Sequence, residues 1–296
     1  MLSASDTRRL DGAPAIDAAP ADLAGLVRVR RRYWGRYAAS IAIVAVLAYV
    51  AAAFARGQIE WRVVGQFLTA RSILTGLGNT IVMTVLAMTL GIVLGVATAV
   101  MRLSSNPVLG AVAQGYIWLF RGTPVILQLL LWFNLALVFP TLGIPGVAEY
   151  RTVDVMTPFL AAVLGLGINQ GAYTSEVVRA GLLSVDTGQY EAAKSIGMAR
   201  LQALRRIILP QAMRVIVPPI GNELIGMVKL TSLASVVQYA EMLHNAQNIY
   251  YANARVIELL IVAGVWYLAV VTVLSFAQAR VEKRFARGAG RGAERK

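Results

Sequence analysis

Six polar residues interrupt the long apolar segments of this chain, and they are the first candidates for chemistry. They are Gln128, Asn169, Gln170, Glu176, Glu223 and Lys229. An ionisable side chain inside a membrane segment is costly, so it is by default a candidate for function. Recognition of a zwitterionic solute needs one group that binds an anion and one that binds a cation. These residues would supply both groups to a small polar solute if they converge.

The amides at 169 and 170 and the carboxylate at 223 have alternative roles. Asn169 and Gln170 lie beside glycines, which let backbones approach or open a cavity, and they fall near the middle of their segment. Substrate sites of transporters tend to lie near that depth. Glu223 follows a proline pair at 218–219, which kinks a helix and frees carbonyl groups. Its carboxylate would then face the path and take an amino group, or it would be a structural residue.

The other three residues have structural alternatives as well. Gln128 would either face the solute or bond across helices, since amide bonds between membrane helices are common. Glu176 has Arg179 three residues further on, which favours a local ion pair. Lys229 lies near the end of its segment, so its ammonium would reach the lipid headgroups or meet a solute carboxylate.

Residues for catalysis or metal binding are scarce. His244 is the single histidine, with no acidic or cysteine cluster near it, and is interpreted as a solvated loop residue. The chain has no cysteine, which excludes disulfides and thiolate metal sites. It has no G-x-x-x-x-G-K-[ST] loop for a nucleoside triphosphate. We therefore expect a protein that is not an enzyme and that holds no metal or cofactor.

The composition indicates a membrane protein. Hydrophobic residues make up 57% of the 296 residues and charged residues only 15%, against about 45–50% and about 25% in soluble domains. The net charge of +13 would suit a nucleic-acid partner, but the basic residues stand at the ends of apolar segments. We expect no nucleic-acid binding and an all-α membrane protein with six transmembrane helices. The expected spans are 37–55, 73–101, 122–139, 157–178, 211–232 and 256–277.

The distribution of basic residues predicts the orientation. With a cytoplasmic N-terminus, most of the 28 Lys and Arg residues fall on the cytoplasmic side, as the positive-inside rule requires. Both termini are then cytoplasmic, with a largely disordered basic tail over 1–36 and a second basic tail over 281–296. The segments 140–156 and 238–255 face outward. Within the second span, Gly91 and Gly95 form a small-x-x-x-small pattern that favours helix packing over chemistry.

A basic segment, EAAKSIGMARLQALRRIILP at 191–210, separates two spans on the cytoplasmic side. Its first residues are strong helix formers. Gly197 lets the chain turn, a second helical piece covers 201–208, and Pro210 ends it before the next span. Such a segment would form a compact knob on the membrane surface. Its alternative is an amphipathic helix lying on anionic lipid.

The spacing in this segment resembles the EAA motif of the permeases of ATP-binding-cassette importers. The matching residues are Glu191, Ala192, Ala193, Gly197, Ile207, Leu209 and Pro210. Other segments resemble the polar amino acid branch of that family, whose solutes include histidine, glutamate, glutamine, arginine and opines. They read FRGTPVILQLLLWFN (120–134), GAYTSEVVRAG (171–181), QYEAAKSIG (189–197), ILPQAMRVIVPPIGNELI (208–225) and MVKLTSLASVV (227–237). The resemblance covers 73–280, and the span 37–55 is additional to the five spans of many relatives.

The resemblance implies a type I importer permease core with one extra N-terminal span, located in the inner membrane. The segment 186–210 would be the coupling loop, which docks on a pair of separate cytoplasmic ATPase subunits that hold ATP and magnesium. Glu191 would form a charge-assisted bond to a basic group of that partner. Further implied partners are a second permease subunit, the same or related, an external solute-binding protein and membrane lipid. The alternatives are a secondary transporter or channel working without ATP, and a membrane scaffold for an ATPase.

Overall fold

The computed structural model describes residues 34–57, 59–144 and 147–286, and it divides into two units after Gly57. The described part of the first unit is one helix, α1 (Trp34–Arg56). Its side chains are apolar on all sides, as expected for a helix that lies in lipid, and it contains the expected span 37–55. The tails were expected at 1–36 and 281–296. Residues 1–33 and 287–296 lie outside the described residues, whereas 34–36 begin α1 and 281–286 are helical, as the last residues of α12 (Val256–Ala286).

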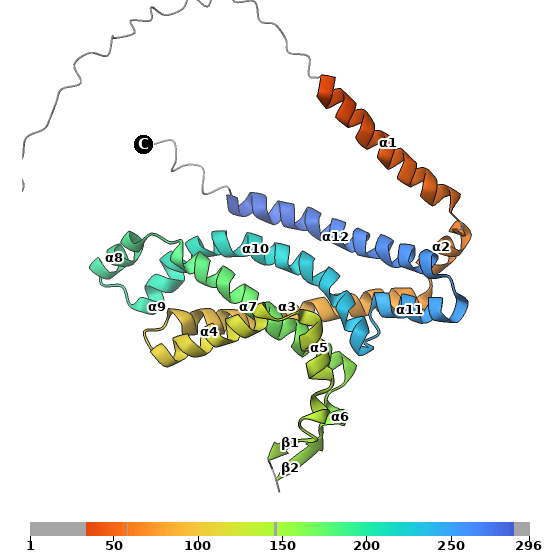
Figure 1. Cartoon of the computed structure of the whole chain (residues 1–296). Helices are drawn as coiled ribbons and strands as arrows, with labels where there is room; N and C mark the ends of the chain where they lie inside the picture. Colours follow the sequence, from red (N-terminus) through yellow and green to blue (C-terminus); the bar gives the residue numbers. More distant parts are fainter. Residues whose placement is uncertain (1–33, 58, 145–146, 287–296) are drawn as a thin grey trace, which may run out of the picture. The chain divides into compact units, whose positions relative to one another are not determined.

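The second unit is helical apart from one short hairpin (Figure 1). Its longer helices are α2 (Trp61–Leu68), α3 (Arg71–Leu103), α4 (Pro107–Gly122), α5 (Val125–Phe133), α7 (Pro158–Leu183), α8 (Thr187–Ser195), α10 (Leu209–Leu230), α11 (Met242–Asn253) and α12 (Val256–Ala286). Its short elements are η2 (Leu135–Leu137), β1 (Thr141–Ile144), β2 (Ala148–Arg151), α6 (Thr152–Val155), α9 (Arg200–Ala203), η3 (Leu204–Ile208) and η4 (Thr231–Val237).

Four helical stretches in the described part of the chain are long and apolar enough to cross a membrane. They are Trp34–Arg56, Arg71–Leu103, Arg200–Val237 and Val256–Phe285. A fifth is the pair α4 and α5, which is bent by 102°. Helix α7 has 26 residues but carries several polar side chains, and it is not among the five. The fold is that of a helical membrane protein, while the number of six spans stays a prediction.

The expected span over 122–139 has a different form in the structure. Helix α4 begins far earlier, at Pro107, and ends at Gly122, and the nine-residue α5 follows after Thr123-Pro124. Pro124 has no N–H to donate and excludes the preceding residue from helical geometry, so the helix breaks there. The apolar character of residues 122–139 predicted one continuous span and gave no sign of this break.

Helix α7 is the centre of the second unit, with α3, α4, α5 and α10 packed around it. Close approach depends on glycine. A Cβ atom on Gly91 of α3 would lie 2.6 Å from Cγ of Gln170, and one on Gly95 would lie 2.7 Å from Cβ of Thr174. The expectation that this glycine pair serves helix packing is confirmed. Both contacts fall on the polar face of α7.

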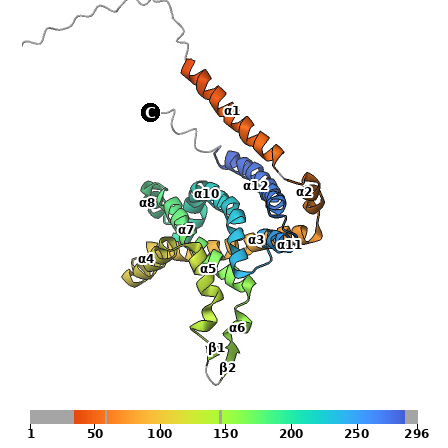
Figure 2. The same ribbon diagram turned by 45° about the vertical axis from the view of Figure 1, so that its right-hand side comes forward.

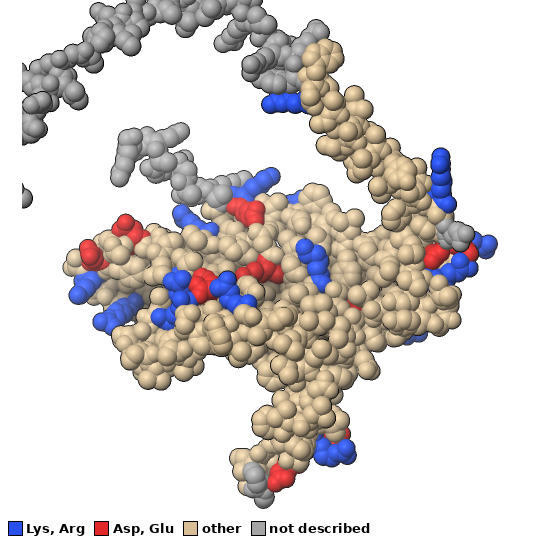
Figure 3. All heavy atoms as spheres, in the orientation of Figure 1, with Lys and Arg blue, Asp and Glu red and all other residues tan. Residues whose placement is uncertain are grey.

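Figure 1 shows α8 and α9 at one end of the second unit and α2 and α11 at the opposite end, and Figure 2 shows the same separation of α8 from α2 and α11. On the face shown in Figure 3, charged side chains gather at these two ends and on the projecting segment below, and the surface between the two ends is mostly uncharged. This distribution is that of a protein whose middle lies in hydrocarbon. In both ribbon views the hairpin of β1 and β2, in which Leu142 pairs with Tyr150, projects away from the helices.

The end that carries α11 is held by a buried carboxylate. Glu241 precedes α11 and accepts the backbone N–H groups of Leu243 (2.8 Å) and His244 (2.6 Å), and the hydroxyl of Tyr267 donates to it at 2.7 Å. Burial raises the pKa of the Glu241 carboxyl, although these hydrogen bonds act in the opposite direction. His244 is therefore a half-buried residue in the first turn of a helix, and its interpretation as a solvated loop residue is wrong.

Candidate functional site

The six polar residues predicted for the solute path do not form one site. Gln128 and Asn169 meet at the break between α4 and α5. The Nε2 group of Gln128 donates to the hydroxyl (2.8 Å) and the carbonyl (3.2 Å) of Thr123 and to the carbonyl of Phe120 (3.1 Å). Asn169 donates to the same Phe120 carbonyl at 2.7 Å and to Oε1 of Gln128 at 3.2 Å.

The broken helix explains this pair of amides. In a continuous helix the carbonyl of Phe120 would accept the N–H of residue 124, but that residue is Pro124 and has none. Gln128 and Asn169 supply the missing donors, and both side chains are buried. A free carbonyl inside a membrane is costly. The structural alternative for Gln128, a bond across helices, therefore accounts for both residues.

Glu176 belongs to a separate ionic cluster. Its Oε2 accepts from Nη2 of Arg179 at 2.9 Å, which confirms the predicted local pair. Its Oε1 is bound by Nη1 of Arg102 at the end of α3, a partner 74 residues away that the sequence did not reveal. Both carboxylate oxygens are occupied by arginine, so Glu176 ties α3 to α7 and offers nothing to a solute.

Gln170 and Glu223 meet in a third cluster, between α7 and α10. Nε2 of Gln170 donates to Oε2 of Glu223 at 2.8 Å. The hydroxyl of Thr174 donates to the same oxygen at 2.9 Å and is 3.1 Å from Nε2 of Gln170. Sequence reasoning missed Thr174, although its position one turn after Gln170 places both residues on one face of a helix. No arginine or lysine among the described residues pairs with Glu223.

Helix α10 is anchored just before Glu223. Nε2 of Gln278, on α12, donates to the carbonyl of Pro218 at 2.9 Å. A Cβ atom on Gly221 would overlap the side-chain amide of Gln278, so only glycine permits this approach. The part of α10 that contains Pro218 and Glu223 is thus bonded on one side to α12 and on the other to α7.

Lys229 does not join any of the three clusters. It is exposed, and so is Asn222, seven residues earlier on the same face of α10. Lys229 is six residues beyond Glu223, about 9 Å along a helix axis at about 1.5 Å per residue. The two charges form no ion pair in the structure. Asn222 is a polar residue on an exposed helix face that the sequence analysis did not select.

An apolar cavity of about 590 Å³ lies between α3, α7 and α10. Its lining includes Met88, Ile92, Val96, Val178, Met213, Ile216, Ile220 and Leu224, and its only polar side chains are Thr174 and Gln278. Such a lining gives a charged or zwitterionic solute no binding partners. The cavity is therefore not the candidate site.

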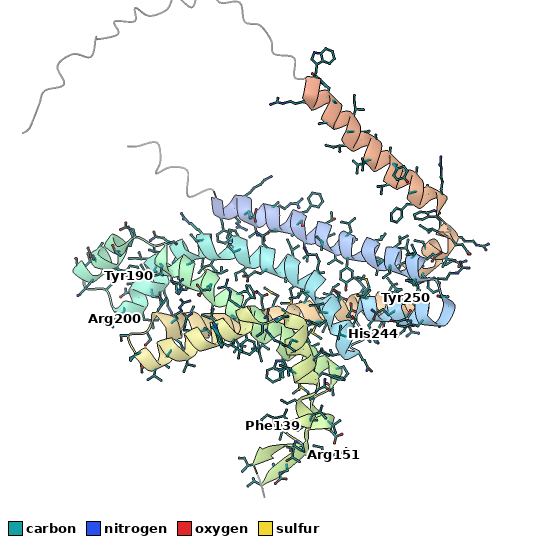
Figure 4. The ribbon with its side chains drawn as sticks, viewed as in Figure 1. Phe139, Arg151, Tyr190, Arg200, His244 and Tyr250 are labelled. Atoms are coloured by element: carbon teal, nitrogen blue, oxygen red, sulfur yellow. The ribbon has the colours of Figure 1, made fainter. Side chains whose placement is uncertain are left out.

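The segment predicted to couple to a partner folds into short helices at one end of the unit, where Tyr190 and Arg200 are labelled (Figure 4). Asp186 begins α8 by accepting the N–H of Gly188 at 2.7 Å. Gly197 ends it with φ at +76°, and the N–H groups of Gly197 and Met198 bond back to the carbonyls of Lys194 (3.0 Å) and Ala193 (3.1 Å). Glycine at this left-handed position is the usual end of a helix.

The second part of the segment differs from expectation. Residues Arg200–Ala203 and the π-helical turn Leu204–Ile208 continue directly into α10. Pro210 was expected to end the helical piece, and that expectation is wrong. Pro210 lies in the first turn of α10, directly after the π-helical turn, and the helix continues beyond it. Proline is tolerated at the start of a helix, because the backbone N–H that it lacks has no partner within the helix there.

Buried and exposed residues alternate in this segment. Ala193 and Ile208 are buried, and Ile208 packs in a cluster with Ala99, Val178, Val185, Ala212 and Ile216. Glu191, Ala192 and Gly197 are exposed, and Ile196 and Leu201 expose 74% and 58% of their surface. Lys194, Arg200, Arg205 and Arg206 of the same segment are exposed as well. We call the exposed residues of 190–206 the coupling surface; it combines exposed apolar residues with four basic residues and the acidic Glu191.

Comparison with known proteins places these features in a family. The model of the family described as "Binding-protein-dependent transport system inner membrane component" matches residues 91–287. The arginine transport system permease protein of Corynebacterium glutamicum is 41% identical over 263 residues, 88% of this chain and 83% of that protein. The glutamine transport system permease protein of Escherichia coli K12 is 33% identical over 228 residues, 77% of this chain and 98% of that protein.

Solved structures agree. The crystal structure of an amino acid ABC transporter with histidines is similar with a TM-score of 0.63 and 36% identity, and the match covers 72% of this chain and 94% of that chain. An inward-facing structure of a methionine ABC transporter gives a TM-score of 0.58 at 20% identity over 72% of this chain and 96% of that chain. At that identity the second likeness shows the fold alone.

Proposed function

We infer, since this chain belongs to the family of binding-protein-dependent transport system inner membrane components, that it is the permease subunit of an ATP-binding-cassette importer. It is a membrane transport protein and not an enzyme. We propose a polar amino acid or a similar small solute as its cargo. The names of its relatives support this class, because they include arginine, nopaline and glutamine permeases.

The coupling surface is the observation that carries the proposed mechanism. The segment 186–210 docks on a separate cytoplasmic ATPase subunit, which holds ATP and magnesium. Ile196 and Leu201 would be costly to leave in water and are suited to a partner's cleft, whose acidic groups would meet the exposed basic residues of the segment. The buried Ile208 then transmits the displacement to α3, α7 and α10.

The other partners follow from the same proposal. Two such permeases, of the same or a related sequence, assemble with two ATPase subunits and with membrane lipid. The segments 140–156 and 238–255 face outward and meet an external solute-binding protein. Their exposed apolar residues, such as Val147 and Tyr251, suit such a contact. Both termini and the coupling surface are then cytoplasmic.

The proposed solute path passes the exposed face of α10, with Glu223 and Lys229 as its charged groups. Gln170 positions Glu223. Gln128 and Asn169 shape the path by holding the break between α4 and α5, and Glu176 does so by tying α3 to α7. A carrier that works without ATP would need ion-coupling acids of its own. This alternative is less well supported, because Glu176, an acid within α7, is bound by two arginines.

The test is ATP hydrolysis by the complex in nanodiscs, with its ATPase and binding protein, across a panel of amino acids. Stimulation by one amino acid, inhibited by vanadate, is the expected result. If the chain retains no ATPase subunit on purification, the proposal fails. If the complex assembles and no amino acid stimulates it, the coupling role stands and the solute class is wrong.

Variants of the coupling surface sharpen this test. We expect Glu191→Lys and Gly197→Asp to abolish uptake while the protein stays in the membrane. Gly110→Asp is the matched control, because Gly110 lies in the first turns of α4 with open space around it and an acid is favourable there. Normal uptake by Glu191→Lys and Gly197→Asp together would contradict the docking role.

A further inference from the structure

The apolar cavity between α3, α7 and α10 has no role in the proposed function. Its volume of about 590 Å³ is within the range of about 300–1,000 Å³ that is usual for cavities that hold a small organic molecule. Its two polar side chains are already bonded within the protein. The hydroxyl of Thr174 donates to Glu223 at 2.9 Å. Nε2 of Gln278 donates to the carbonyl of Pro218 and to Oε1 of Glu282, both at 2.9 Å. The cavity therefore offers a ligand no free donor.

The cavity opens at the surface beside α3. The lining residues Ile92, Val96 and Val100 of that helix are exposed, whereas Val178 of α7 and Ile216 of α10 are buried. An apolar cavity stays dry, so water does not fill it. If it stayed empty, its lining would lose van der Waals contacts. In a helical membrane protein, the ligand that can enter such an opening is a hydrocarbon chain.

The length of the cavity matches one leaflet of a bilayer. Its lining on α3 extends from Met88 to Val100, a rise of about 18 Å at about 1.5 Å per residue. The hydrocarbon core of a bilayer is about 30 Å thick, so one leaflet accounts for about 15 Å. Val100 is close to the end of α3, and Leu209 and Met213 lie in the first turns of α10. The lining thus begins at the end of the unit that carries the coupling surface and reaches about halfway across the membrane.

Basic residues lie at the same end of the cavity. The bond from Gln278 to the carbonyl of Pro218 joins α12 to α10. Arg214 is one turn before Pro218, and Arg280 is two residues beyond Gln278, and both are exposed. Arg214 forms no ion pair with any described residue, and Arg280 bonds only to a carbonyl of its own helix, at 3.3 Å. Arginine is well suited to bind a phosphate group.

We propose that this cavity binds one anionic phospholipid of the cytoplasmic leaflet. One acyl chain lies along the lining of α3 and α10, and the phosphate accepts hydrogen bonds from the guanidinium groups of Arg214 and Arg280. The inference uses the topology of the proposed function, in which the coupling surface is cytoplasmic, but it does not depend on transport. The chain also contacts Ile216, which packs in the same apolar cluster as Ile208, so the lipid supports the helices next to the coupling surface.

Photolabelling of the permease with its ATPase in nanodiscs tests this site. The probes are phosphatidylglycerol and phosphatidylcholine with identical chains, each carrying a diazirine in one acyl chain, and mass spectrometry identifies the labelled peptides. We expect the lining of α3 and α10 to be labelled at least about tenfold more by phosphatidylglycerol at equal mole fraction. Equal labelling by the two lipids would overturn the proposal. A lining without label would overturn it too, and is the result expected if a second permease covers this face. Labelling needs no ATP hydrolysis, so a failure of the transport proposal would be seen separately.

Variants separate the acyl chain from the phosphate. Val96→Trp fills the cavity and should abolish labelling of the lining, whereas Val93→Trp, exposed on the same helix but outside the lining, should keep it. If Val96→Trp does not insert, Val96→Phe must show the same loss. Unchanged labelling in the inserted variant would contradict the proposal.

The combined variant Arg214→Gln and Arg280→Gln should lose the preference for phosphatidylglycerol and keep the labelling by phosphatidylcholine. The control combines Arg62→Gln with Arg71→Gln, two exposed arginines of α2 and of the first turn of α3, and removes the same charge. It should keep the preference. An equal loss of preference in both combined variants would mean that net charge, and not this site, selects the lipid.

Discussion

Gly91 and Gly78 lie on the same helix and differ in what a methyl group would meet. A Cβ atom on Gly91 would lie 2.6 Å from Cγ and 2.8 Å from Cβ of Gln170, whereas one on Gly78 would have nothing within 4 Å. Ordinary contacts begin at 3.4 Å, so Gly91→Ala forces α3 and α7 apart by most of an ångström. Overpacking of this kind costs about 1–3 kcal/mol.

Gly78→Ala measures the effect of helix propensity alone. Replacing a helical glycine by alanine without a clash stabilises a helix by about 0.5–1 kcal/mol. The two variants should therefore differ in free energy of unfolding by about 1.5–4 kcal/mol. Thermal unfolding of the purified permease in identical nanodiscs, followed by tryptophan fluorescence, gives the comparison. If Gly91→Ala is as stable as Gly78→Ala, the packing described between α3 and α7 is wrong.

The same pair of variants tests the link between packing and the polar cluster. The atom displaced by Gly91→Ala belongs to Gln170, which fixes Oε2 of Glu223. The affinity for the transported solute should therefore fall in Gly91→Ala and stay unchanged in Gly78→Ala. A destabilised Gly91→Ala variant with wild-type affinity would mean that Gln170 does not position the carboxylate.

Two further predictions concern the break and the end of the unit. Gln128→Leu removes a donor from the carbonyls of Phe120 and Thr123 and should lower the free energy of unfolding by about 1–3 kcal/mol. The control Gln114→Leu, on the exposed face of α4, should change it by no more than about 0.5 kcal/mol. Equal effects of the two variants in thermal unfolding would show that the break between α4 and α5 needs no hydrogen bond from Gln128. Burial raises the pKa of the Glu241 carboxyl in the folded state above its pKa in the unfolded state. The folded state therefore binds the carboxyl proton more tightly, and the contribution of Glu241 to stability falls as the pH rises from the unfolded pKa to the folded pKa. The wild type should gain more stability than Glu241→Gln when the pH is lowered from neutral to mildly acidic, and an identical gain in both would refute the assignment.

Local features of the site were predictable from the sequence because they depend on spacing along one helix. The pair of Glu176 with Arg179 needs only a separation of three residues, and the glycine pair at 91 and 95 needs only four. The turn at Gly197 follows from the conformational freedom of glycine after a run of helix formers. In each case the interaction or the conformation depends on residues within one or two helical turns, and the structure shows it as predicted.

Features that depend on which helices meet were not predictable. Arg102 reaches Glu176 across 74 positions, and Gln170 reaches Glu223 across 53. Hydrophobic periodicity indicates which face of a helix is buried but not its neighbour. The break at Pro124 was missed for a related reason, because a proline in an apolar segment is tolerated when other side chains supply donors. Those donors, Gln128 and Asn169, lie one turn and 45 residues beyond the proline.

The proposed coupling surface and the proposed solute path share two helices, α7 and α10. Ile208 is buried against Val178 of α7 and Ala212 of α10 at the end of the unit that carries the coupling surface. Further along the same two helices, Gln170 and Thr174 of α7 hold Oε2 of Glu223 on α10 at 2.8 and 2.9 Å. A contact at about 3.6 Å is no longer a hydrogen bond. If docking on the coupling surface moved α10 away from α7 by about one ångström, both distances would pass that limit and the carboxylate of Glu223 would lose the two donors that orient it.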